Sequence, residues 1–302
     1  MYIADGHCDY LYKSLRNQST AVSVESLKRN HVKLQNFAVF VEPTRKTAVD
    51  VREVYAQLAL FEQLIKANKD IQPVTKKAHL QSSRVLLCLL SIEGCNVLSY
   101  QADMFDRLWE RGVRMYGLVW NYDNLYAGTC YAEKQKGLSD QGIMLLRKIA
   151  DRQGILDVSH MSEAGFWDCL QYLPKGAGVV ASHSNCRSLC NHRRNLTDRQ
   201  IQALIEAGGI IGVNFVPMFL NEHRAADIHD VIAHIDKIIA LGGEDHVALG
   251  SDFDGADMID DLPSPDAYST LAKVLHKRYN KEIVGKIMYG NWHRFLSNML
   301  PD

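Results

Sequence analysis

The chain has 302 residues, with 34 lysines and arginines against 35 aspartates and glutamates, and a formal net charge of -1. Apolar residues make up 47% and charged residues 23%, which is the balance of a globular protein able to bury a sizeable core. The near-neutral charge argues against a nucleic-acid binder that relies on a basic surface. No apolar run approaches the roughly 18 residues of a membrane helix, so we expect no membrane partner.

The N-terminal segment and the cysteines bear on where the protein works. The first residues, MYIADGHCDYLYK, lack the basic and long apolar regions of a signal peptide. The seven cysteines are scattered without a CxxC pair, which favours free thiols over a disulfide framework. Both features predict a cytoplasmic protein. No linker rich in proline, glycine or serine divides the chain, so we expect a single domain over residues 1–302.

Eight short apolar runs predict β-strands along the chain. In order they are Ile3–Asp5, Phe37–Val41, Val85–Ser91, Met115–Val119, Ile155–Val158, Gly178–Ala181, Ile210–Phe215 and Val247–Gly250. The runs lack strict alternation of apolar and polar residues, which is typical of parallel strands covered on both faces.

Helical patterns lie between several of these strands, and the first crossover, about residues 11–36, is the least clear. The predicted helices are Val49–Ala67, one capped by Ser139 and running to about Gln153, one capped by Thr197 and running through Ala207, and Ile228–Leu241. Eight strand–helix units predict an α/β fold, a (β/α)8 TIM-type barrel. The alternative is a doubly wound open sheet, but the glycine-rich nucleotide loop usual in such sheets is absent.

Ionisable residues follow five of the predicted strands. They are His7 and Asp9 after the first, Glu93 after the third, His160 after the fifth, His183 after the sixth and Asp252 after the eighth. In a parallel barrel the carboxyl ends of all strands open onto one face, so we expect these side chains to converge there. His7 and Asp9 are two apart, so in an extended segment both would point the same way.

Three imidazoles and two carboxylates suit zinc, with manganese, cobalt or iron as alternatives. Five ligands exceed what one tetrahedral zinc takes from a protein, so the pattern predicts two ions, which Glu93 can bridge. Two ions can lower the pKa of a shared water towards ~7, and the resulting hydroxide can attack an amide carbonyl. Asp252 remains to pass the proton to the leaving amine. Metal-assisted amide hydrolysis is therefore expected.

Other hydrolytic chemistries lack their sequence patterns. The chain contains neither a GxSxG nucleophile elbow nor an HExxH zinc helix. Ser182 and His183 are not expected to act as a couple, because adjacent side chains on a strand point to opposite faces.

The ordered motifs resemble those of the membrane (renal) dipeptidases, zinc metallopeptidases of the amidohydrolase type. The matching segments are DGHCD at 5–9, SIEG at 91–94, GVRMYGLVWN at 112–121, DVSH at 157–160, SHSN at 182–185, HRRN at 192–195, GSDFDG at 250–255 and NWHRFL at 291–296. The resemblance therefore covers nearly the whole chain.

This resemblance implies a distorted barrel with a two-zinc centre and assigns roles to particular residues. The implied metal ligands are His7, Asp9, a bridging Glu93, His160 and His183. Asp252 would act near the scissile bond. Arg194 would receive the terminal carboxylate of the substrate, which a guanidinium can grip with two parallel hydrogen bonds. The implied substrates are small dipeptides, often with a tolerated C-terminal D-residue, and a homodimer is expected by analogy.

One departure from the family pattern concerns Trp120. Animal members carry a substrate-contacting histidine there, whereas this chain reads Val119-Trp120-Asn121. An indole can only donate one hydrogen bond, so Trp120 is expected to pack either against the substrate or within the barrel mouth. The chain also shows neither the secretion signal nor the lipid-anchor tail of animal members, and it looks more like a soluble bacterial member.

The main hypothesis is thus a cytoplasmic zinc-dependent dipeptidase. One alternative is another amide hydrolase on the same scaffold, acting on N-acyl-D-amino acids or cell-wall peptide fragments. A phosphoester hydrolase can use similar metals, and a binding protein that kept the barrel but lost catalysis is the hypothesis from a different class. A requirement for a free amino terminus in the substrate would separate the first two.

Overall fold

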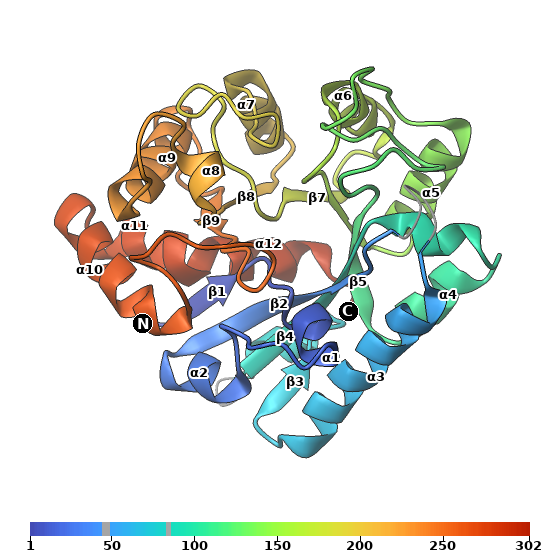
Figure 1. Ribbon diagram of the computed structural model, residues 1–302, viewed down its shortest axis with the longest axis horizontal. Helices are drawn as coiled ribbons and strands as arrows, with labels where there is room; N and C mark the ends of the chain where they lie inside the picture. The colour runs from blue at the N-terminus through green and yellow to red at the C-terminus, as the bar shows by residue number, and fades with distance from the viewer. Residues whose placement is uncertain (44–48, 83–85) are drawn as a thin grey trace.

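A computed structural model describes residues 1–43, 49–82 and 86–302 of the chain. Its centre is a closed barrel of parallel strands, and Figure 1 shows the helices arranged around these strands. The barrel strands are β1 Ile3–Asp5, β2 Val32–Phe40, β4 Leu86–Glu93, β5 Val113–Gly117, β6 Ile155–Asp157, β7 Gly178–Ala181, β8 Ile210–Val213 and β9 Val247–Leu249. The barrel closes because β1 pairs with both β2 and β9, and β2 pairs with β4. The predicted TIM-type barrel is confirmed, and the open-sheet alternative is wrong.

The predicted strands agree with the barrel strands in number and order, but some bounds differ. Strands β1 and β7 have the predicted bounds, whereas β2 begins at Val32, earlier than predicted. Its first half contains Lys33, Gln35 and Asn36, which are buried, so the apolar pattern understates its length. The third predicted strand began at Val85, which lies outside the described residues, and β4 continues to Glu93.

A ninth strand, β3 Ile71–Pro73, was not predicted. It pairs with the first residues of β4, on the side where β5 pairs with the later ones. Three residues ending in a proline are too short to show a strand pattern, so β3 could not be recognised from the sequence.

The four predicted helices are present as α3 Val51–Ala67, α5 Asp140–Asp151, α7 Asp198–Glu206 and α9 Ile228–Ala240. As predicted, Ser139 and Thr197 cap their helices by accepting backbone N–H groups. The first crossover holds two short helices, α1 Tyr10–Leu15 and α2 Val24–Arg29. The remaining helices are α4 Met104–Glu110, α6 Glu163–Tyr172, α8 Pro217–Leu220, α10 Tyr268–Arg278, α11 Lys281–Gly285 and α12 Asn291–Met299, with single turns at Lys77–Gln81, Cys95–Ser99, Pro265–Ala267 and Lys286–Gly290.

Helix α12 fills the barrel from the end where the strands begin. Its Trp292, Phe295 and Leu296 are fully buried and join one apolar cluster with inward residues near the strand starts, such as Leu34 and Leu87. The Trp292 Nε1 donates to the Leu249 carbonyl at 2.9 Å. A packed interior at this end leaves the opposite end, where the strands finish, to form a site.

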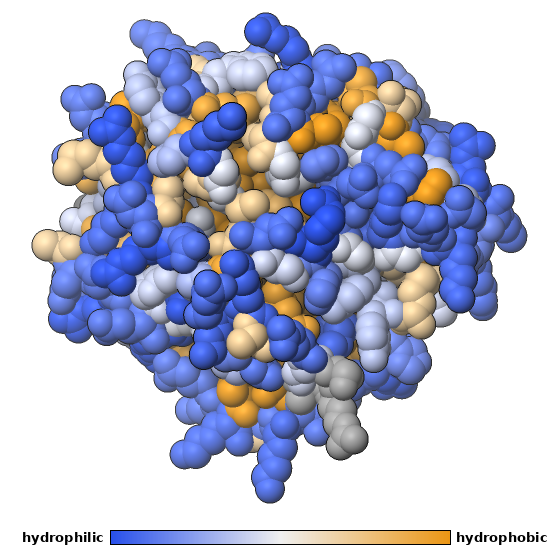
Figure 2. Space-filling view, turned by 180° about the vertical axis from the view of Figure 1, so that it is seen from behind, coloured by the Kyte–Doolittle hydropathy of each residue, from blue (hydrophilic) through white to orange (hydrophobic). Residues whose placement is uncertain are grey.

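The cysteines, the helix lengths and the molecular surface can be compared with the expectations from the sequence. All seven cysteines are free thiols, as predicted, and all of them are buried. Within residues 1–43, 49–82 and 86–302, the helices are too short or too polar for any of them to cross a bilayer. The face drawn in Figure 2 is mostly hydrophilic, with apolar side chains visible in patches between charged ones.

Candidate functional site

The structure brings the predicted ligand residues together where the barrel strands end. His7 and Asp9 follow β1, Glu93 ends β4, and His160 and His183 follow β6 and β7. The Glu93 Oε1 lies 2.7 Å from His160 Nε2 and 3.6 Å from His183 Nε2. Its Oε2 lies 3.5 Å from His7 Nε2. One carboxylate therefore stands between the residues from the start of the chain and those from its middle.

Two of the groups that could hold a metal ion contain the predicted ligands, and the three ligand atoms of each group lie within 4.8 Å of one another. The groups are Glu93 with His160 and His183, and His7 with Asp9 and Asp252. A third such group is formed by His7, Asp157 and His183. Asp252, assigned from the sequence to proton transfer rather than metal binding, thus lies close to the first ligand pair as well. Its Oδ1 is 3.9 Å from His7 Nε2.

Unsatisfied polar atoms test whether these residues fit a cation. Within the described part of the chain, both ring nitrogens of His7 and the Asp9 Oδ1 are buried without a hydrogen-bond partner. An unsatisfied buried polar group costs about 1–3 kcal/mol. A divalent cation bound by His7 and Asp9 would remove that cost for the atoms facing it. Imidazoles and carboxylates are also the donors that zinc and similar metals take, so the residues fit a metal site.

The electrostatics of the cluster favour a cation in the same place. Burial works to lower the pKa of His7, but the carboxylates of Glu93 and Asp9 hold that pKa well above its ordinary value. For Glu93, burial is outweighed by His7 and His160, which lower the pKa of the carboxyl well below its usual range. Burial lowers the pKa of His160 to about 4, and burial together with His7 lowers that of His183. His160 and His183 are thus neutral beside an ionised Glu93, which are the protonation states that metal ligands require, whereas His7 has to release its proton when it binds a cation.

Second partners fix the orientation of two imidazoles. His160 Nδ1 lies 2.8 Å from Asn121 Oδ1, and His183 Nδ1 lies 2.7 Å from Ser182 Oγ. The Ser182 hydroxyl in turn donates to the carboxylate of Asp157. When each Nδ1 carries the proton, Nε2 presents its lone pair towards Glu93, as a metal ligand must.

The contact between Ser182 and His183 corrects a prediction. Adjacent side chains were expected to point to opposite faces of a strand, yet they are hydrogen-bonded. The reason is that β7 ends at Ala181, so both residues lie in the turn beyond it. The couple supports the His183 ring and is anchored by Asp157, whose Oδ1 also accepts the backbone N–H groups of Ser159 and Ser182 at 3.0 Å.

A second buried aspartate, Asp5, links the segment after the first barrel strand, β1, to the segment after the last, β9. Its Oδ1 accepts the backbone N–H groups of His7 at 3.3 Å and Ser251 at 2.8 Å, and its Oδ2 accepts the hydroxyl of Tyr268 at 2.6 Å. Asp5 and Asp157 were not predicted as supporting residues. The available signal was a carboxylate at the end of an apolar run, two or three residues before a predicted histidine ligand.

Asp252 has the setting of a proton carrier. It is buried and adopts a left-handed backbone with φ of 70°. Burial, together with the nearby carboxylates of Asp9 and Glu93, raises the pKa of Asp252 to about 7, against the opposing effect of His7. Asn214 Nδ2 donates to its Oδ2 at 2.9 Å, which leaves Oδ1 facing the cluster. A carboxyl group with a pKa near neutrality can both accept and return a proton.

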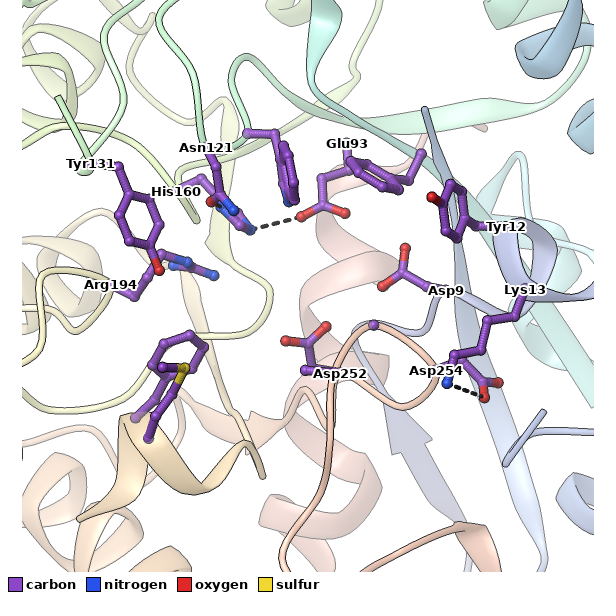
Figure 3. Close-up of a pocket in the computed structure, with 16 residues that line it drawn as sticks. Asp9, Tyr12, Lys13, Glu93, Asn121, Tyr131, His160, Arg194, Asp252 and Asp254 are labelled. Carbon is purple, nitrogen blue, oxygen red and sulfur yellow. Dashed lines mark hydrogen bonds and ion pairs between the residues drawn. The ribbon is translucent and has the colours of Figure 1, made fainter. Parts of the chain in front are cut away.

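The cluster opens into a cavity of about 310 Å³. Arg194 and Tyr131 stand at one end of it, and Tyr12 and Lys13 at the other (Figure 3). Arg194 is buried, and its guanidinium donates to the His183 carbonyl at 3.4 Å.

Trp120 lines the same cavity. Its ring centroid is 4.7 Å from that of Phe40 and 6.3 Å from that of His160. The indole therefore forms part of an aromatic wall beside one predicted ligand.

Comparison with known proteins identifies the family. Residues 1–299 match the family model described as membrane dipeptidase, Peptidase family M19. The chain belongs to this family. Among curated relatives, it is 32% identical over 261 residues to an uncharacterised protein from the region 5' of pqqA in Klebsiella pneumoniae, covering 82% of this chain and 96% of that protein. It is 29% identical over 255 residues to dipeptidase tcpJ of Claviceps purpurea, covering 82% of this chain and 60% of that protein.

Solved structures of metallopeptidases have the same fold. A dipeptidase described as a metallopeptidase of family M19 superimposes with a TM-score of 0.90 at 23% identity, covering 100% of this chain and 99% of that one. A metallopeptidase from Rhodobacter sphaeroides, solved with a phosphinate mimic of the dipeptide L-Ala-D-Ala, gives 0.89 at 24% identity and covers 99% of both chains. The predicted membership of the dipeptidase family is confirmed.

Proposed function

We propose that this M19 protein is a zinc-dependent dipeptidase with two ions per chain, held by His7, Asp9, Glu93, His160 and His183. The observation that carries the proposal is the position of Glu93, with one oxygen near His7 and the other near His160 and His183. A carboxylate so placed can join two cation sites. Bound divalent cations would supply the Lewis-acid chemistry, by acidifying a water molecule and polarising the peptide carbonyl.

The residues of the chain would then handle the proton and the substrate. Asp252 would accept a proton from the attacking water through Oδ1, the oxygen that faces the cluster, and return it to the departing amine. Asn214 keeps the other oxygen of Asp252 turned away from the reaction. The buried guanidinium of Arg194 binds the α-carboxylate of the substrate.

The size of the cavity supports a small substrate. A volume of about 310 Å³, with Arg194 at one end, suits a dipeptide rather than a longer peptide. Tolerance of a C-terminal D-residue is proposed because the similar Rhodobacter sphaeroides enzyme was solved with a mimic of L-Ala-D-Ala. We also propose that residues 1–302 act as one domain, since β1 from the start of the chain pairs with β9 near its end.

The test is hydrolysis by the zinc-loaded protein of L-Ala-L-Ala, L-Ala-D-Ala, the N-acetylated form of each, and a phosphate ester. Metal content is measured in the same samples, beside D252N and a chelated control. We expect two zinc ions per chain and turnover of the free dipeptides alone, lost in both controls. Turnover of the acetylated peptides would instead show an N-acyl amino acid hydrolase, and turnover of the ester a phosphoesterase. A protein that binds no metal would overturn the proposal.

A further inference from the structure

We infer that Lys13 forms a subsite for an anionic side chain on the N-terminal residue of the substrate, so that dipeptides beginning with glutamate or aspartate are preferred. This inference rests on the proposed dipeptidase function and specifies its substrate class. Three observations carry it: Arg194 and Lys13 lie at opposite ends of the cavity, the end near Lys13 has a distinct composition, and the Lys13 ammonium has few contacts.

Different residues stand at the two ends of the cavity, so a dipeptide bound through Arg194 would lie in one orientation. Figure 3 shows Arg194 and Tyr131 on one side, Lys13 and Tyr12 on the other, and Glu93 between them. If the α-carboxylate binds Arg194, the scissile amide lies across the predicted metal ligands. The N-terminal residue must then extend towards Tyr12 and Lys13.

That far end combines an apolar wall with one cation, Lys13, and with the carboxylates of Asp9, a proposed metal ligand, and Asp254. The rings of Tyr12 and Phe40 have centroids 5.0 Å apart, and those of Phe40 and Trp120 are 4.7 Å apart, so three aromatic rings follow one another along the wall. The methylene groups of a side chain can pack against these rings. Among the described residues that line the cavity, Lys13 and Arg194 are the only lysine and arginine. A side chain that follows the wall and ends in a carboxylate would meet the Lys13 ammonium.

The ammonium of Lys13 keeps donors for such a ligand. Its nearest acidic partner is Asp254, whose Oδ1 is 3.9 Å from Lys13 Nζ, which is beyond hydrogen-bond distance. The two oxygens of Asp254 already accept the backbone N–H groups of Ala21 at 2.7 Å and Val22 at 3.2 Å. Figure 3 shows the lysine beside Asp254 at the edge of the cavity. With 32% of its side chain exposed, Lys13 is only partly screened by solvent.

The experiment compares kcat/KM for L-Glu-L-Ala and L-Gln-L-Ala, which differ in charge but hardly in shape. We expect the zinc-loaded protein to prefer the glutamyl substrate about tenfold, a difference of about 1.4 kcal/mol. In K13M the ratio should fall to about one, and in K13R it should be largely retained. Because each ratio is measured on one enzyme preparation, a loss of folded protein cancels. Raising the salt concentration should also lower the wild-type ratio, since a partly exposed charge is screened.

The matched control is K277M, since Lys277 is exposed on α10 away from the cavity residues and its removal should leave the ratio unchanged. A wild-type ratio near one with both substrates hydrolysed would overturn the inference alone. A K13M ratio equal to that of the wild type would do the same. If neither these peptides nor L-Ala-L-Ala were hydrolysed, the proposed dipeptidase function would fail, and this inference with it.

Discussion

Glu93 and His160 meet with Oε1 2.7 Å from Nε2, while the other carboxylate oxygen of Glu93 faces His7 at 3.5 Å. The two imidazoles come from opposite sides of Glu93 in the chain, and His7 follows β1 whereas His160 follows β6. The barrel alone brings them together, because the carboxyl ends of all its strands share one face. Removing the charge of Glu93 should therefore affect both halves of the cluster.

We expect E93Q to bind fewer than two zinc ions per chain and to lose at least a hundredfold in kcat. A glutamine amide keeps the shape of the side chain but offers one neutral oxygen, so it cannot serve two cations. Metal content after dialysis and steady-state kinetics on a free dipeptide check both effects. The control is E110Q, because Glu110 is exposed at the end of α4. An E93Q protein with two tightly bound ions would contradict the bridging role.

Arg194 and its neighbour Arg193 allow a test of carboxylate recognition. Arg194 is buried beside the cluster, whereas Arg193 is exposed and donates to the Tyr131 carbonyl at 3.0 Å. We expect R194M to lose about a hundredfold in kcat/KM on free dipeptides, mainly through KM, and to lose its discrimination against dipeptide amides. R193M should keep that discrimination. If R194M still distinguished acids from amides as the wild type does, another group would have to bind the carboxylate.

The sequence was a better guide to the candidate metal ligands than to the residues that hold those ligands in place. His7, Glu93 and His183 could be found because each follows an apolar run at the end of a strand. Asp5 and Asp157 also end strands, but a carboxylate at a strand end shows only that it lies near the site, and not whether it binds a metal or supports a ligand. Their partners come from other elements, as Tyr268 does for Asp5 and Ser182 does for Asp157. These are tertiary contacts without a sequence pattern.

The packing along the substrate side of the cavity likewise depends on tertiary contacts that leave no pattern in the sequence. The side chains of Phe40, Trp120 and Tyr12 form one wall although they come from three separate segments. Lys13 sits on α1, in the crossover where the helical pattern was least clear, so its approach to the cavity could not be predicted. Composition and periodicity thus locate strand ends, whereas the lining between them depends on how loops and short helices pack.

Ser182 offers a test of indirect support to a metal ligand. Its hydroxyl links His183 Nδ1 to the Asp157 carboxylate, so S182A should free the ring to change its tautomer and orientation. Loss of such an outer partner typically costs 10–100-fold in metal affinity. We expect this loss in competition titrations with a zinc chelator, with a smaller change in thermal stability of the metal-free protein. S297A, which removes a hydroxyl bonded within α12, is the comparison. Equal zinc affinity in S182A and wild type would remove Ser182 from this role.

His234 predicts a pH effect on stability that is separate from the metal cluster. The ring is buried in α9, where its Nδ1 accepts the Cys186 backbone N–H at 3.0 Å and its Nε2 donates to the Leu220 carbonyl at 3.1 Å. Burial lowers the pKa of His234 below its ordinary value of 6.5. The unfolded state therefore takes up a proton first, and the contribution of His234 to stability is present above pH 6.5 and is lost as the pH falls below it.

We expect H234Q to be less stable than wild type by about 1–3 kcal/mol at pH 7.5, because its amide cannot reproduce both backbone hydrogen bonds. The difference should shrink as the pH falls to 5, since only the wild type loses the contribution of the neutral ring. Urea unfolding of the metal-free proteins at both pH values measures it, and the histidines of the metal cluster cancel because both proteins contain them. H276Q, on the exposed face of α10, should follow the wild type at both pH values. A difference between H234Q and wild type that stayed constant or grew on acidification would show that His234 is not held neutral by the fold.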